Sequence, residues 1–217
     1  MKVNREIVTT AALALLNRVG LEGLTLRLLA DELDVKAATL YWHFKSKQEL
    51  IDEVATAVLA KGAPQLLPAR ESADWTGWAT AFGAGLRQVL LAYRDGARTI
   101  AGTRLNGIDY MKTVERIAGR LVEAGFTVRE ATVLLSTIYN YTVSFTMEEQ
   151  AVFPRPGERS AQYDLGQRKA RLADAGLPLL RQAGEILFDK FDRRYKEGLM
   201  LIVRGAGLQI VGHDAPA

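Results

Sequence analysis

The stretch Thr39-Leu40-Tyr41-Trp42-His43-Phe44-Lys45-Ser46-Lys47 sets two apolar side chains four residues apart within a run of polar and aromatic residues. At that spacing Leu40 and Phe44 share one face of a helix, whereas Trp42 points away from it. A helix this short is not stable alone, so it must pack against its neighbours. We therefore expect residues 36–44 to form a helix with one buried apolar face and one exposed polar and aromatic face.

The segments on either side predict three further helices. Residues 5–19 carry apolar side chains at helical spacing, and Gly20 ends that run. Thr25 is placed to cap a second short helix. Ser46 and Glu49 form a capping-box pattern, in which each side chain satisfies a free N–H group of the helix that follows. Two short helices joined by a tight turn and flanked by longer ones are typical of a helix-turn-helix.

Composition excludes several classes of protein. The 217 residues include no cysteine and only two histidines, His43 and His213. Disulfides, cysteine nucleophiles and histidine-rich metal sites are therefore excluded, and we expect no metal, no cofactor and no enzymatic activity. No apolar run reaches the roughly 20 residues that span a bilayer, and the first residues do not read as a signal peptide. We expect a cytoplasmic protein with no membrane partner.

The rest of the chain predicts more helices and no strands. Gly62, Pro64 and Pro68 interrupt the pattern, so we place a domain boundary there, with one domain at 1–61 and a larger one at 62–217. Residues 153–170 look like a long mobile loop. The fold class we predict is all-α, with an N-terminal three-helix helix-turn-helix domain, a connecting helix and a larger helical domain. Helical runs are expected at 74–93, 94–100, 108–124, 127–151 and in two segments after Pro178.

The exposed face of the 36–44 helix suits a DNA groove. Ala38 and Thr39 are small enough to let the helix approach the base edges, and Thr39 can bond a base or touch a thymine methyl group. An aromatic side chain left in water, such as Trp42, usually has a partner. The net charge of +3 decides nothing about DNA binding, which depends on local charges. The alternative is that these are ordinary surface residues of a domain that never touches DNA.

These residues resemble the DNA-binding domain of the tetracycline-repressor (TetR) family. The resemblance rests on residues 20–25, 29–30, 33–35 and above all 39–47. It implies phosphate contacts from Arg27, Tyr41 and Lys47, and base or groove contacts from Ala37, Ala38, Thr39, Trp42 and His43. We also include Lys36, just before this helix, in the expected DNA-binding set. Ala37 and Ala38 depart from the family prototype, so its operator sequence is not carried over.

The larger domain is similar to the tetracycline-binding subgroup of that family. Matching segments, in order, are 90–91, 93–97, 102–104, Tyr110, 125–126, 148–150 and 178–183. The resemblance implies a homodimer whose interface uses the helix near 128–151 and the last helix, with a ligand pocket in each half. An apolar stripe at Leu199, Ile202 and Val203 favours burial of the last helix. That stripe could also pack only within its own subunit.

The expected pocket departs from the subgroup. There, histidines ligate the magnesium of a tetracycline chelate and an asparagine binds the drug, whereas Ile100 and Phe82 occupy the matching positions here. We therefore expect a hydrophobic, ring-containing ligand, unless these two side chains fill the cavity. The apolar lining expected is Phe82, Leu86, Ile100, Leu105, Ile117, Leu135 and Tyr139. Arg116 and Asn140 are the expected polar anchors. Thr103, Arg104 and Glu148 are further expected ligand contacts. The alternative for Arg104 and Glu148 is that they form a structural ion pair.

Together these observations predict a ligand-responsive transcriptional regulator. We expect a repressor that binds a palindromic operator in double-stranded DNA as a homodimer and that a hydrophobic small molecule releases. The segment from Arg94 to Ile100 is the expected transmitter, because a ligand that prefers one arrangement of the DNA-binding heads shifts the population toward it. The alternative is a helical ligand-binding or interaction protein without specific DNA binding.

Overall fold

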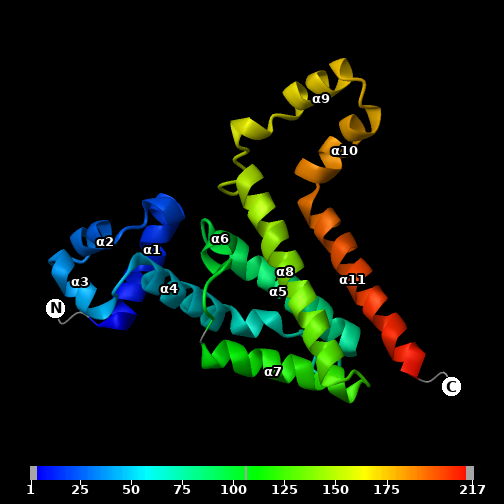
Figure 1. Cartoon of the computed structure of the whole chain (residues 1–217), viewed down its shortest axis with the longest axis horizontal. Helices are drawn as coiled ribbons and strands as arrows, with labels where there is room; N and C mark the ends of the chain where they lie inside the picture. The colour runs from blue at the N-terminus through cyan, green and yellow to red at the C-terminus, as the bar shows by residue number, and fades with distance from the viewer. Residues whose placement is uncertain (1–3, 106, 214–217) are drawn as a thin grey trace.

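The computed structural model describes residues 4–105 and 107–213, and within those residues the chain is all-α, as predicted, with no β-strand (Figure 1). None of the helices in these ranges combines the length and the apolarity that crossing a bilayer requires. The helices are α1 (Arg5–Gly23), α2 (Leu26–Glu32), α3 (Ala37–His43), α4 (Lys47–Gly62), α5 (Trp75–Leu91), α6 (Gly96–Ile100), α7 (Ile108–Glu123), α8 (Val128–Val152), α9 (Leu165–Asp174), α10 (Pro178–Phe188) and α11 (Phe191–His213).

Helices α1 to α4 form the N-terminal part, with Leu40 and Phe44 fully buried in its core. The Thr25 side chain accepts a hydrogen bond from Leu28 N and begins α2, as predicted. Of the capping box predicted for α4, the Ser46 part is confirmed and the Glu49 part is wrong. Its first half forms, since Glu49 N donates to Ser46 Oγ at 3.1 Å, but the Glu49 carboxylate accepts from Lys45 N at 2.8 Å. Glu49 thus fixes the turn between α3 and α4 instead of closing the box.

Helix α5 is the centre of the larger part and packs against α6, α7, α8 and α11. Residues 63–66, in the predicted break, form a short 3-10 helix that is packed tightly on α5. Gly85 permits this approach, because a β-carbon there would lie 1.9 Å from Gln65 O. The segment is therefore a packed connection and not an extended linker. Our boundary between residues 61 and 62 stays a prediction.

A buried ion pair joins three helices of the larger part. Arg87 on α5 donates two hydrogen bonds to Glu149 on α8, at 2.8 and 2.6 Å, and a third to Asp192 on α11 at 2.7 Å. Its guanidinium also lies over the Tyr195 ring, 5.1 Å from the centroid. Removing Glu149 would leave the Arg87 charge uncompensated in the core, so this buried pair fixes how α5 and α8 meet, whereas the 83% exposed Asp192 adds a contact to α11 at the surface.

The predicted loop at 153–170 is wrong in its second half. Asp164 accepts from Gln167 N at 2.7 Å and begins α9, which packs on α10 and buries none of its own residues. The two helices form a hairpin at the end of α8 and α11 that lies away from α1 to α4 (Figure 1). The glycines and prolines of 154–157 indicated a loop, and in the charged segment that follows only Leu165 and Leu172 mark the apolar face of a helix.

We predict opposite effects for two glycine-to-alanine changes in helices. Gly85→Ala should lower the free energy of unfolding by about 1 to 3 kcal/mol, because its methyl group overlaps the carbonyl of Gln65. Gly119→Ala on α7 meets nothing within 4 Å and should raise the free energy of unfolding by about 0.5 to 1 kcal/mol. Chemical denaturation of both variants measures the difference. Equal effects would contradict the close packing of residues 63–66 on α5.

Candidate nucleic-acid interface and ligand chamber

Helix α3 presents one face to solvent and buries the other. Trp42 is 89% exposed and Tyr41 55% exposed, whereas Leu40 and Phe44 are fully buried. Among the other expected contacts, Lys36 and Ala38 are exposed, and Ala37, Thr39 and His43 are half-buried. The exposed aromatic pair is therefore held on a helix whose other face is fixed by the core.

Arg5, on α1, supports this helix in a way that the sequence analysis missed. Its Nη1 donates to the His43 carbonyl at 2.5 Å, and its guanidinium lies 4.4 Å from the centroid of the Phe44 ring. The same guanidinium pairs with Glu49 and Glu53 on α4, each at 3.0 Å. The carbonyls at the end of a helix need partners, and Arg5 supplies one while joining α1, α3 and α4. Neither helical periodicity nor motif spacing indicates such a contact.

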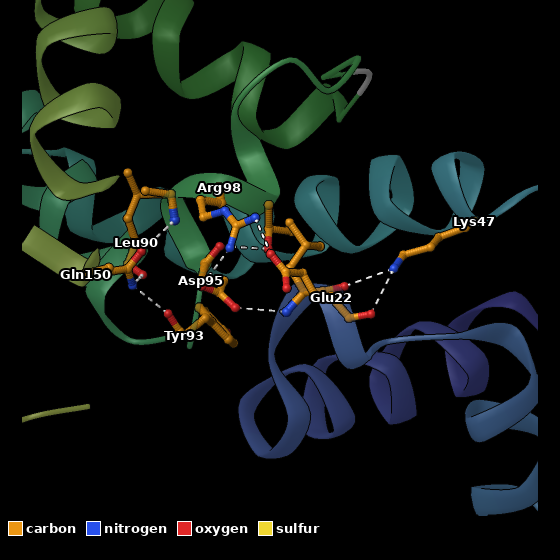
Figure 2. Close-up of polar contacts among 10 residues, drawn as sticks. Glu22, Lys47, Leu90, Tyr93, Asp95, Arg98 and Gln150 are labelled. Carbon is orange, nitrogen blue, oxygen red and sulfur yellow. Dashed lines mark hydrogen bonds and ion pairs between the residues drawn. The ribbon is translucent and has the colours of Figure 1, made fainter. Parts of the chain in front are cut away.

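The two cations expected to reach phosphates differ in their surroundings. Arg27 is exposed and, among the described residues, has no hydrogen bond or ion pair. Lys47 instead donates from Nζ to the carbonyls of Leu21 and Glu22, at 3.0 and 3.4 Å (Figure 2). Lys47 thus holds the end of α1 against the start of α4 in this conformation. Arg27 is the cation with its charge available to a phosphate.

A break in α1 connects the N-terminal part to the larger part. Gly20 has φ of 76°, a left-handed conformation that favours glycine, and the break frees the amide of Leu21. Asp95 Oδ2 accepts that amide at 2.9 Å (Figure 2). Arg94 Nη1 donates to Arg18 O at 2.7 Å. The residues just before α6 therefore bind the end of α1 directly.

The same junction continues through α6 to α8. Arg98 pairs with Glu22 at 3.0 Å and with Asp95 at 3.7 Å. On the other side, Gln150 of α8 donates to Tyr93 O at 2.8 Å and to Leu90 O, and its Oε1 accepts from Ala97 N at 3.1 Å (Figure 2). Helix α6 is thus fixed at one side by the larger part and at the other by the N-terminal part.

A chamber of about 870 Å³ lies between α5, α7 and α8. Five residues from the predicted set line it: Phe82, Thr103, Leu105, Leu135 and Tyr139. Phe82 and Ile100 are both buried, yet a cavity of this volume remains beside them. The alternative in which these two side chains fill the cavity is therefore wrong. The lining is mainly apolar and aromatic, as expected of a site for a small hydrophobic molecule.

The other predicted ligand residues are not brought to this chamber. Leu86, Ile100 and Ile117 are fully buried in the core and do not line it. Arg116 pairs with Glu71, and Asn140 and Arg104 are exposed outside the lining. Glu148 forms an ion pair with Arg194 of α11. Its role is therefore structural, as in the alternative given above, but its partner is Arg194 and not Arg104. Neighbouring residues on a helix point about 100° apart, so an error of one position moves a side chain off a wall.

Further lining residues lie on α7 outside the predicted set, among them Tyr110, Val114 and Ala118. Their spacing of four places them on one helix face, which is the signal that could have found them. Burial raises the pKa of Tyr110 well above its ordinary value, helped by the electrostatic effect of Tyr139, and burial also raises the pKa of Tyr139. Tyrosine phenols are protonated at neutral pH at their ordinary pKa, so both groups can donate hydrogen bonds there, and burial extends this to more alkaline solution.

Comparison with known proteins gives matches over nearly the whole chain. The family described as "Bacterial regulatory proteins, tetR family" matches residues 8–54, and "Tetracyclin repressor-like, C-terminal domain" matches residues 67–210. The tetracycline repressor protein class A of Escherichia coli is 41% identical over 94% of this chain and 90% of its own length.

Two solved structures share the fold. A possible TetR family transcriptional regulator from Streptomyces coelicolor has a TM-score of 0.83 and 33% identity, over 94% of this chain and 99% of that one. A TetR variant from Acinetobacter baumannii in complex with minocycline has a TM-score of 0.75 and 31% identity, over 96% of this chain and 99% of that one. These likenesses extend across both the candidate DNA interface and the chamber.

The raised pKa of the chamber phenols predicts a loss of stability in alkali. Tyrosine in the unfolded chain releases its proton near pH 10, before the folded protein does, so the stability present below that pH is lost as the pH rises further. Tyr110→Phe should make this decline shallower. Denaturation curves between neutral pH and alkaline pH measure it, and identical declines in both proteins would contradict the assignment.

Proposed function

The chain belongs to the TetR family of bacterial transcriptional regulators, and we propose that it is a repressor that a hydrophobic small molecule releases from its operator. It is a regulator and not an enzyme. Two copies of the chain bind one palindromic operator, since paired recognition helices engage half-sites about 34 to 36 Å apart. Its target is the cell's own DNA, so we place the protein in the cytoplasm.

The observation that carries the DNA-binding part of the proposal is the exposure of Trp42 on α3. Helix α3 is held by Leu40 and Phe44 and can enter the major groove as a rigid body. Ala38 and Thr39 then face the base edges, and Tyr41 and Arg27 face the phosphates. Lys47 joins the phosphate contacts only by giving up its bonds to the α1 carbonyls. Its first role is to orient the domain.

The effector binds in the chamber between α5, α7 and α8. A tetracycline–magnesium chelate does not suit it, because Ile100 and Phe82 offer no atom that ligates a metal, and Ile100 does not face the chamber. The apolar lining favours a hydrophobic ring compound. Five residues of the predicted set, from Phe82 to Tyr139, remain our proposed ligand contacts.

Helix α6 couples the chamber to α3. Thr103 lines the chamber and donates from Oγ1 to Ile100 O, the last residue of α6, at 2.7 Å. A ligand that displaces Thr103 therefore moves α6, and with it Asp95 and the end of α1. The ligand releases DNA when it binds more tightly to the arrangement in which the two recognition helices no longer match the half-sites.

Two alanine substitutions should separate phosphate contacts from base contacts. Arg27→Ala should weaken binding to operator and random duplexes alike and lower the salt-dependence slope by about 1. Thr39→Ala should weaken operator binding by about 1 to 2 kcal/mol and leave binding to random DNA unchanged. Gel shifts on an operator selected from a random duplex library measure both, with Arg171→Ala on α9 as a matched arginine control. No operator emerging from that selection would contradict DNA binding.

Release should depend on the contact between Asp95 and Leu21. Hydrophobic compounds that raise the melting temperature of the wild-type protein should also release its operator. In Asp95→Ala the same compounds should still raise the melting temperature but should release the operator about 10-fold less effectively, because the coupling is weakened. Asp174→Ala on α9 is the control. Equal release by wild type and Asp95→Ala would contradict this route, and a library without any releasing compound would contradict the sensor.

A further inference from the structure

The hydrogen-bonding groups of the chamber are few, and most of them are already used. Thr103 Oγ1 donates to Ile100 O at 2.7 Å, Thr132 Oγ1 to Val128 O at 2.7 Å, and Ser136 Oγ to Val133 O at 3.0 Å. Each hydroxyl has a single proton, so these three side chains have no donor left for a ligand. The backbone amides in the interior of the surrounding helices are also bonded within those helices.

Two lining side chains differ from these hydroxyls. Tyr110 on α7 and Tyr139 on α8 both line the chamber, and among the described residues their phenol groups have no hydrogen-bond partner. Tyr195 and Tyr141, by contrast, bond to Thr142 and to backbone carbonyls elsewhere in the core. Both residues are half-buried, and neither hydroxyl is a buried unsatisfied group, so each remains accessible to a ligand that enters the chamber. These two phenols are therefore the side-chain donors that a ligand can use. Both phenols carry their proton at neutral pH and can donate it to an acceptor.

The charge of the chamber limits the ligand further. Among the residues that the structure describes, its lining contains one carboxylate, that of Glu115, and no lysine, arginine or histidine. The arginines of α7 lie elsewhere, since Arg116 and Arg120 both pair with Glu71. A ligand carboxylate would lose its hydration without gaining a cation, and it would also be repelled by Glu115.

We propose that the chamber selects uncharged, planar aromatic ketones, whose carbonyl oxygen accepts hydrogen bonds from Tyr110 and Tyr139, and that it rejects carboxylates of the same ring system. The rings of Phe82 and of the two tyrosines supply aromatic faces for a flat ligand, and a chamber of about 870 Å³ holds several fused rings. This assignment rests on the proposed function only in taking the chamber as the effector site. It replaces Arg116 and Asn140 as polar anchors.

Three probes that share one ring system test the proposal by calorimetry on the full chain. Fluorenone presents a ketone, fluorene presents none, and fluorenone carboxylate adds a negative charge. Fluorenone should bind about 10-fold more tightly than fluorene, in keeping with one or two hydrogen bonds, and the carboxylate should bind at least about 10-fold more weakly than fluorenone. Equal affinities for fluorenone and fluorene, tighter binding of the carboxylate, or no binding of fluorenone would overturn the proposal.

Phenylalanine variants identify the groups responsible. Tyr110→Phe and Tyr139→Phe should each weaken fluorenone binding by about 2- to 10-fold and leave fluorene binding unchanged, because only the hydroxyl is removed. Tyr163→Phe, outside the chamber, is the matched control, and melting temperatures verify that each variant folds. Unchanged fluorenone affinity in both chamber variants would overturn the assignment. Operator gel shifts on the same samples are a separate readout, so loss of DNA binding or of release counts against the proposed function and not against this selectivity.

Discussion

The hydrogen bond between Leu21 N and Asp95 Oδ2 is the contact through which the break in α1 is held by the start of α6. A helix that breaks at Gly20 exposes amides and carbonyls that must be satisfied, and a carboxylate from the larger part satisfies one of them. A β-carbon at position 20 would lie 2.7 Å from the same carboxylate oxygen. Glycine at this position is therefore needed both for the helix break and for the close approach of Asp95. Lys47 completes the junction by bonding two of the freed carbonyls.

This junction makes the orientation of α3 sensitive to a site far from it. The chamber shares Thr103 with the end of α6, and α6 in turn is held by Gln150 of α8 and by the end of α1. These contacts are hydrogen bonds and ion pairs at a partly exposed junction, each worth only about 0.5 to 3 kcal/mol. A ligand of ordinary affinity can therefore shift them, whereas the apolar core around Leu40 and Phe44 is too strongly packed to change.

Periodicity and capping motifs predicted most of the helices because they depend on residues close in sequence. Thr25, Asp74 and Thr127 begin helices at or next to the expected positions. The misses were α9, whose apolar stripe is short and consists of Leu165 and Leu172 among charged residues, and Glu49, whose carboxylate accepts from Lys45 N.

The site was predicted less completely than the fold. The exposed face of α3 follows from the spacing of Leu40, Trp42 and Phe44, which is a local property. The walls of the chamber depend instead on how α5, α7 and α8 rotate against one another, and a rotation by one residue turned Ile117 into the core and Ala118 toward the chamber. Long-range ion pairs such as that of Arg116 with Glu71 leave no trace in local spacing.

The hairpin of α9 and α10 exposes apolar surface that the subunit itself does not cover. Helix α10 leaves Leu179 77% exposed and Ile186 57% exposed, and the only residue it buries is Gly184. Apolar surface of this kind contributes little to the folding of one chain, so the free energy gained by covering it belongs to association. The stabilisation of this arm by a covering partner would therefore depend on subunit concentration, unlike that of the core around Leu40 and Phe44.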